Sequence, residues 1–439
     1  MRIPLTQHSE HILTSGSPRE RSMDIVEYAD LVWSGKADDS IVQGGLAGHG
    51  VVDVVDGVGF RSGFGNTVVV RDAGRAALFD TGNPFDAARL HREVREWTAD
   101  PVTEVVYSHG HIDHVSGVGP FDAEAEAAGR PRPVVSAHEA VAARFDRYLM
   151  TLGYNSVINR RQFQIDDLSW PSEYRYPDVV YRDTLTAGPF ELFHGKGETD
   201  DASVGFLPGQ RVLLPGDLFI WVSPNCGNPQ KVQRYPREWA IALRRMATLN
   251  AEIMLPSHGA PVFGADRVEQ ALIETAEWLE SLVEQTLAML NDGARLDAIV
   301  REVRPPARLA DRPYLRPHYD EPEFIVRNIW RLYAGWYDGN PANLKPAPDA
   351  VLAAAVAGLA GGAARLGEAA QRALEAGDLR LAGHLAEMAV QAAPEDADLH
   401  RIRAEVFAAR AAAEASLMAR GVFSWAAAES RRAAGPQGG

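Results

Sequence analysis

Cysteine, long apolar runs and an excess of basic residues are all missing from this sequence. Its 439 residues include a single cysteine, Cys226, which excludes an intramolecular disulfide framework and fits a reducing compartment. No apolar run approaches the roughly 20 residues that a membrane-spanning helix needs. Residues 1–23 carry charged and polar side chains without the apolar core of a secretory signal. We therefore expect a soluble, cytoplasmic protein with a loose N-terminal lead.

The balance of charge is acidic. Lysine and arginine number 44 against 59 aspartate and glutamate residues, which gives a formal net charge of −15. Such a surface repels nucleic acids and anionic membranes, so neither is expected as a main partner. A local basic pocket for a small anionic substrate is compatible with an acidic surface elsewhere.

Strand-like segments dominate the first part of the chain. Residues 51–55, 66–71 and 76–82 are apolar and bounded by turn residues, which predicts strands. A helical pattern over residues 84–98 separates them from another apolar run that begins at Val105. This alternation predicts a layered α/β domain, and the length of the chain predicts a second domain.

The most informative stretch lies where the apolar run from Val105 ends in His109, His111, Asp113 and His114. His109 and His111 are two residues apart and can clamp one metal, while Asp113 and His114 turn toward a second. Imidazole and carboxylate without thiolate suit zinc, or less selectively manganese or iron. The cluster therefore predicts a metal site in a loop that follows a buried strand.

This His-x-His-x-Asp-His run resembles the signature of the metallo-β-lactamase superfamily. The resemblance implies an αββα sandwich with the metals at one edge, and further ligands at later strand ends. Three candidates follow in chain order, namely Glu198 after a Gly-Lys-Gly turn, Asp217 after an apolar strand, and His258 after another.

The seven implied ligands form two sets that share a bridging carboxylate. They are His109, His111 and Glu198 for one metal, Asp113, His114 and His258 for the other, and Asp217 as the bridge. The resemblance also gives Asp80 a place behind the ligands, where it would orient a ligand histidine. An alternative for Asp80 is an N-cap of the next helix.

Glu198 stands where most of the superfamily has a histidine, and this resembles the zinc-dependent alkylsulfatase branch. Those enzymes usually bridge their metals with a second glutamate, whereas this chain has Asp217. The Gly-Trp-Tyr-Asp-Gly-Asn-Pro run at residues 335–341 resembles the opening of the alkylsulfatase dimerisation domain. The resemblance spans roughly residues 45–430.

Alanine- and leucine-rich helical sequence follows this run and predicts an all-α domain of packed helical hairpins. The helices are expected at residues 349–365, 366–376, 379–393 and 396–420. We expect a homodimer through this domain. The expected segments are an N-terminal arm (1–44), a metallo-β-lactamase-like catalytic domain (45–290), an interdomain segment (291–345), the helical dimerisation domain (346–430) and a disordered tail (431–439).

The resemblance further implies a basic group that holds the sulfate of a substrate. Arg234 follows the bridging aspartate at a suitable interval and has the forked donors that fit a tetrahedral anion, although an ordinary surface arginine is an alternative. Asn225, Arg160 and Arg161 are further substrate-binding candidates, the last two in an irregular segment read as part of the substrate wall. A sterol-carrier-like domain found in full-length alkylsulfatases is expected to be absent from this chain.

The ligand set and the resemblance to alkylsulfatases together imply a binuclear zinc hydrolase that acts on a sulfate ester or a related anionic ester, through water activated by two cations. Asp113, Asp217 and Arg234 are the predicted catalytic residues. Cleavage of the S–O bond and of the C–O bond are both compatible with this prediction. The alternatives are a lactam, lactone or thioester hydrolase, and a non-catalytic scaffold that retains the fold.

Overall fold

A computed structural model describes residues 24–37, 46 and 48–435. The chain forms two compact units. Unit 1 comprises residues 1–152, 170–292 and 299–333, and unit 2 comprises residues 153–169, 293–298 and 334–439. Most of the expected N-terminal arm lies outside the described residues. Within it, Asp24 caps the short helix α2 (Ile25–Trp33) by accepting from two backbone amides.

The first sheet of unit 1 has seven strands that lie in sequence order. Strands β1 to β4 pair antiparallel, and β4 to β7 pair parallel. Their bounds are β1 (Val51–Val55), β2 (Val58–Arg61), β3 (Thr67–Asp72), β4 (Arg75–Phe79), β5 (Val102–Val106), β6 (Val134–His138) and β7 (Val179–Tyr181). Residues 67–70 of β3 are buried throughout, as expected for a strand covered on both faces.

The second sheet has six strands in the order β13-β12-β11-β10-β9-β8, with a single parallel pair, β11 with β12. The strands are β8 (Thr184–Ala187), β9 (Phe190–His194), β10 (Ser203–Leu207), β11 (Val212–Leu214), β12 (Ile253–Met254) and β13 (Val262–Phe263). Phe79 of the first sheet meets Phe190 of the second, with 5.9 Å between ring centroids. A Cβ atom on Gly205 would lie 2.8 Å from the Phe79 ring, so the sheets approach closely where glycine stands.

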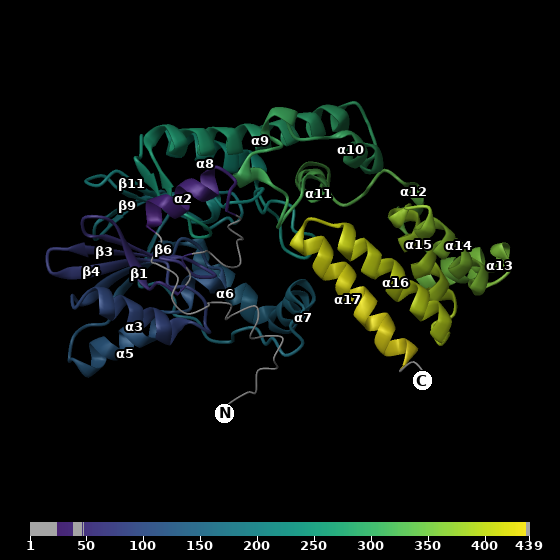
Figure 1. The fold of residues 1–439 in the computed structure, drawn as a ribbon, viewed down its shortest axis with the longest axis horizontal. Coiled ribbons are helices and arrows are strands. Elements are labelled where there is room, and N and C mark those ends of the chain that lie inside the picture. The colour runs from purple at the N-terminus through teal and green to yellow at the C-terminus, as the bar shows by residue number, and fades with distance from the viewer. Residues whose placement is uncertain (1–23, 38–45, 47, 436–439) are drawn as a thin grey trace. The chain divides into compact units, whose positions relative to one another are not determined.

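Helices cover the outer faces of both sheets. Helices α3 (Ala87–Trp97) and α5 (Gly119–Ala127) pack together on one side, and α8 (Pro236–Ala247) and α9 (Ala265–Asn291) pack together on the other (Figure 1). Leu90 and Val94 of α3 join a core with Leu78 and Val105 of the first sheet. The αββα sandwich expected from the sequence is therefore confirmed.

Further helices complete unit 1. They are α4 (Ile112–Val115), α6 (Ala140–Met150), α11 (Pro322–Ala334) and the short 3-10 turns η1 (Gly216–Leu218), η2 (Ala307–Leu309) and η3 (Pro313–Leu315). Helix α10 (Leu296–Glu302) crosses the boundary between the units. Much of the expected interdomain segment, residues 299–333, thus belongs to unit 1.

Unit 2 is helical, as the sequence predicts. Its helices are α7 (Leu152–Phe163), α12 (Pro341–Leu344), α13 (Asp349–Ala360), α14 (Ala363–Glu375), α15 (Leu379–Ala392), α16 (Ala397–Ala413) and α17 (Leu417–Ala434). Neighbouring helices pack in succession, most extensively α14 with α15 and α16 with α17. Small apolar clusters around Ala386 and Ala389 form its core.

Three local expectations were wrong. The segment around Arg160 is not an irregular loop but helix α7, which packs against α17, because Gly421 lets the Gln162 backbone approach closely. The helix expected over residues 396–420 is two helices, since Glu414 is extended and Ser416 caps α17. Helix α17 continues to Ala434, so residues 431–434 are helical, and residues 436–439 lie outside the described residues.

Among the described residues, no single helix combines the length and apolar character needed to cross a membrane. Helices α13 and α14 taken together are long and apolar enough for a membrane span by length and composition alone, but the two helices are bent by 86° relative to each other.

Candidate metal centre

Every predicted metal ligand lies in a loop or short turn that follows a strand at one edge of the sandwich. His109 and His111 follow β5, and α4 then presents Asp113 and His114. Glu198 follows β9, Asp217 lies in η1 just after β11, and His258 follows β12. Strand β5 belongs to the first sheet, and β9, β11 and β12 belong to the second, so the packing of the two sheets brings together side chains that lie up to 149 positions apart in the sequence.

The ligand atoms form two groups in the described part of the chain. His109, His111, Glu198 and Asp217 make one group, and Asp113, His114 and His258 make the other, each with its ligand atoms within 4.8 Å of one another. Each group holds enough imidazole and carboxylate for one divalent cation.

Asp217 lies between the two groups. Its Oδ2 atom is 3.7 Å from His109 Nε2 and 3.4 Å from His258 Nε2, and its Oδ1 atom is 3.6 Å from His114 Nε2. One carboxylate thus faces residues of both candidate ligand groups.

The unpaired polar atoms of the cluster fit a bound cation. Among the described residues, His114 Nε2, Glu198 Oε2 and Asp217 Oδ1 are buried and have no hydrogen-bond partner. Leaving such groups unpaired in the interior costs about 1–3 kcal/mol each, and more for charged groups. A divalent metal would satisfy all three, because each atom is a lone-pair donor that faces the other ligands.

Burial and neighbouring charges shift the pKa values of the histidines in different directions. Burial lowers the pKa of His109 to about 4, and it holds the pKa of His111 well below its usual value, helped by His109, Arg144 and Arg234. Burial also disfavours charged His114, but Asp217, Asp113 and Asp80 outweigh it and raise its pKa. His109 and His111 are therefore neutral at neutral pH, which is the form that binds a metal.

Asp80 contacts His114 at its Nδ1 atom. Its carboxylate is fully buried and lies 2.9 Å from His114 Nδ1, while it accepts from the Ser108 amide and hydroxyl at 2.7 Å and from the Ser257 hydroxyl at 2.8 Å. The alternative of a helix N-cap is wrong, because Asp86 holds that position at α3. Neither serine was singled out in the sequence.

Glu198 is held by two of the residues predicted to bind substrate. Asn225 Nδ2 donates to its Oε1 atom, and Arg234 Nη1 donates to its backbone carbonyl at 2.6 Å. Arg234 Nη2 also lies 3.4 Å from Glu198 Oε1. Arg234 is only 2% exposed, so the alternative of an ordinary surface arginine is wrong. Arg160 and Arg161 lie on α7 in unit 2, and their role in substrate binding stays a prediction.

Lys231 is a basic residue that the sequence reasoning missed. Burial and the nearby charge of Arg234 lower its pKa to about 7, while Asp113 and Glu198 oppose that shift. Its position in the loop between Asn225 and Arg234 was the only signal in the sequence.

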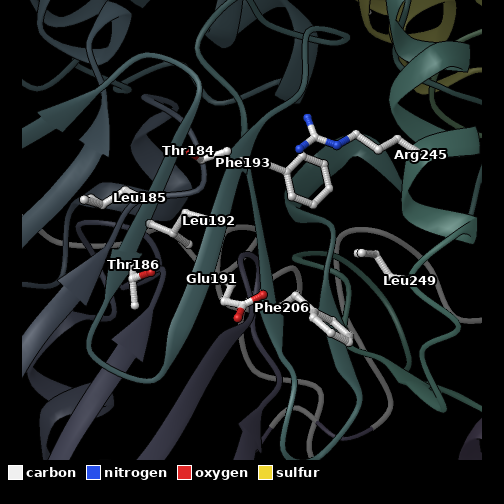
Figure 2. Close-up of a pocket in the computed structure, with 9 residues that line it drawn as sticks. All are labelled: Thr184, Leu185, Thr186, Glu191, Leu192, Phe193, Phe206, Arg245 and Leu249. Atoms are coloured by element: carbon white, nitrogen blue, oxygen red, sulfur yellow. The ribbon is translucent and has the colours of Figure 1, made fainter.

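A separate pocket lies on unit 1, and none of the predicted ligands lines it (Figure 2). Strands β8, β9 and β10 form one wall, and Arg245 and Leu249 come from α8 and the residues just after it. The Arg245 guanidinium lies 4.0 Å from the centre of the Phe193 ring. The metal cluster and this pocket are thus distinct features of the same domain.

Two families match the chain in sequence. Residues 61–258 match the metallo-beta-lactamase superfamily, and residues 295–433 match the alkyl sulfatase dimerisation family. The first match includes all seven predicted ligands. The second includes most of unit 2 together with α11 of unit 1.

Curated relatives and a solved structure are similar to most of this chain. A linear primary-alkylsulfatase from Pseudomonas sp. is 29% identical over 75% of this chain and 67% of its own length. An (R)-specific secondary-alkylsulfatase from Pseudomonas sp. is 26% identical over 77% of this chain and 56% of its own length. The inverting sec-alkylsulfatase Pisa1 from Pseudomonas sp. superposes with a TM-score of 0.77 at 22% identity, over 87% of this chain and 65% of that one. The chain thus spans between about half and two thirds of the length of these proteins.

The Asp80→Asn variant tests whether the buried carboxylate prepares the metal site. An amide would present donor hydrogens where His114 Nδ1–H and two serine hydroxyls now find acceptors, so we expect the zinc affinity to fall by about 10–100-fold. Competition with a chromophoric chelator on metal-free protein measures this affinity. Asp53→Asn, which changes an exposed carboxylate of the same domain, is the control. An unchanged affinity in Asp80→Asn would show that this residue does not orient a ligand.

Proposed function

We propose that this chain, which belongs to the metallo-β-lactamase superfamily and joins that domain to an alkylsulfatase dimerisation domain, is a metal-dependent hydrolase of sulfate esters. The observation that carries the proposal is the pair of buried ligand groups with Asp217 between them and Glu198 among the ligands. The alkylsulfatase relatives support sulfate esters as the substrate class.

We propose two zinc ions as the cofactors, because a nitrogen and oxygen ligand set without thiolate suits zinc, with manganese or iron as weaker candidates. His109, His111 and Glu198 would hold one ion, Asp113, His114 and His258 the other, and Asp217 both. Bound in this way, the ions would activate water and neutralise charge that develops on the ester.

The residues around the ligands suit an anionic substrate. The Arg234 guanidinium lies 3.4 Å from Glu198 Oε1. Lys231 stands three residues earlier in the same loop, and its pKa of about 7 leaves this side chain partly positively charged at neutral pH. Charge-assisted hydrogen bonds from such groups are the stronger kind, which favours a sulfate group over a neutral amide. Arg234 additionally keeps the Glu198 carboxylate in place through the backbone.

Sulfate release from alkyl sulfates tests the activity. Zinc-reconstituted protein is expected to release sulfate from a panel of primary and secondary alkyl sulfates, and chelated protein is expected to release none. Glu198→Ala removes one ligand of the first group and should reduce turnover by at least about a hundredfold, since about 2.7 kcal/mol of transition-state stabilisation corresponds to that factor. Released sulfate is measured by ion chromatography.

The same experiment separates the alternatives. Reaction in ¹⁸O-water places the label in sulfate if the S–O bond breaks and in the alcohol if the C–O bond breaks. A wild-type protein that carries two zinc ions but releases no sulfate from any ester would contradict the proposal. The assay would then turn to lactones, lactams and thioesters with the same protein.

Substitution of Lys231 tests anion recognition. Lys231→Gln removes a positive charge and is expected to raise KM for alkyl sulfates by about 10–100-fold, because a hydrogen bond to a charged group contributes about 1.5–3 kcal/mol. The zinc content should stay at the wild-type level. Lys345→Gln, at an exposed position of unit 2, is the control. An unchanged KM would exclude Lys231 from substrate binding.

We further propose that unit 2 forms a homodimer, in line with the matched dimerisation family. Helix α13 exposes large apolar side chains to solvent, with Leu352 49% and Leu359 91% exposed. These two residues are seven positions apart and therefore share one face of the helix. A face of this kind is typical of a surface that another copy covers.

The dimer proposal is tested by placing charge on this face. Replacing Leu352 and Leu359 together with glutamate is expected to convert a dimer into a monomer, because two buried carboxylates would face the partner. Light scattering after size exclusion measures the mass. Ala354→Glu places the same charge on the opposite exposed face of α13 as a control. A wild-type monomer, or a dimer that survives the double substitution, would contradict this interface.

A further inference from the structure

We propose that Arg144 and Asp201 are positioning residues that hold the loop of His109 and His111 in the geometry for metal binding. The inference rests on the proposed metal centre but concerns residues outside the ligand set. Neither residue was singled out in the sequence, and no ligand role is needed for either one.

The pair contacts the ligand loop through Gly110. Asp201 Oδ2 accepts a hydrogen bond from Arg144 Nε at 2.6 Å and from the Gly110 amide at 3.2 Å. Asp201 is fully buried and Arg144 is 3% exposed. Because Gly110 stands between His109 and His111, a displacement of its amide moves both imidazoles.

The three groups come from three separate segments of unit 1. Arg144 lies on α6, Gly110 lies in the loop after β5, and Asp201 lies three residues after Glu198. The Ser203 amide also donates to the Ser108 carbonyl at 2.6 Å, so the two ligand-bearing loops are joined at two points. Asp201 therefore couples the position of the histidines to that of Glu198.

Glycine at position 110 is required for this approach. A Cβ atom there would lie 2.8 Å from Arg144 Cδ and 3.1 Å from Asp201 Oδ2. Both distances are shorter than ordinary contacts, so a side chain at this position would push the pair away from the loop.

Charge balance gives the pair a second role. The buried Arg144 side chain packs against Gly110, between the two histidines, so an uncompensated guanidinium there would repel a cation bound by them. Asp201 neutralises it, and Arg144 in turn keeps the pKa of this buried carboxyl low. Asp200 contacts Arg144 Nη2 as a second, more exposed partner. The ligand loop thus gains a rigid support without net positive charge.

Zinc titration of metal-free Asp201→Asn protein is the test. We expect at least about a tenfold loss of affinity for one of the two zinc equivalents, the magnitude seen when residues behind metal ligands are changed. Hydrogen exchange of the metal-free protein should show faster exchange in the peptide that contains Gly110. Asp122→Asn, which removes a carboxylate paired with Arg175 at 3.1 Å elsewhere in unit 1, should change neither quantity.

Two further variants separate positioning from general stability. The double variant Arg144→Met/Asp201→Asn removes both charges, so it should recover part of the zinc affinity that Asp201→Asn alone loses, while exchange at Gly110 stays fast. Gly110→Ala keeps both charges but displaces the pair, and should also weaken one zinc equivalent. This variant decides the question if Asp201→Asn does not fold.

The outcomes are distinguishable. Wild-type protein that binds two zinc ions, together with unchanged affinity in both Asp201→Asn and Gly110→Ala, would overturn the positioning role alone. Failure of the wild type to bind zinc would overturn the metal centre and this inference with it. Equal loss of both zinc equivalents in Asp122→Asn would show that any weakened ion pair has the same effect, which also overturns the proposal.

Discussion

The site depends on an electrostatic constraint, because it buries carboxylates and imidazoles that do not complete one another's hydrogen bonds. Glu198 and Asp217 are 2% and 8% exposed, and each leaves a buried oxygen without a hydrogen bond within the described structure. Burial of unpaired ionised carboxylates is unfavourable unless a cation or a strong donor faces them. The arrangement makes physical sense as a cage for divalent metal, and the surrounding residues can be understood by how they hold it.

The fold supplies this cage by ending several strands at one edge. Asp80 ties three of the strand ends together, since its carboxylate contacts His114, Ser108 and Ser257. Its backbone has a φ of 61°, a left-handed conformation that non-glycine residues seldom adopt. Such local strain persists where the surroundings over-determine it, and here four polar contacts converge on one side chain.

The arginines near the site surround the candidate metal ligands and are not themselves ligands. Arg234 and Asn225 fix Glu198, Arg144 is neutralised by Asp201, and Lys231 retains a lowered pKa beside the ligands. Local positive charge beside Glu198 is thus compatible with a net charge of −15 over the whole chain. Glu198 is fixed at two points, because Asn225 Nδ2 donates to its carboxylate and Arg234 Nη1 donates to its backbone carbonyl.

Local patterns in the sequence predicted a layered α/β domain, a helical second part and a metal site at residues 109–114. The αββα arrangement and the later ligands followed from the resemblance to the metallo-β-lactamase superfamily, because strand periodicity and ligand spacing are local. It misjudged the segment at Arg160 and the break before Ser416, where packing against Gly421 and a single cap decide the structure. Only the tertiary structure brought Asp201 beside Gly110 and turned Arg234 toward Glu198. These contacts join residues 91 and 36 positions apart, and no local periodicity encodes which buried charges will meet when two sheets pack.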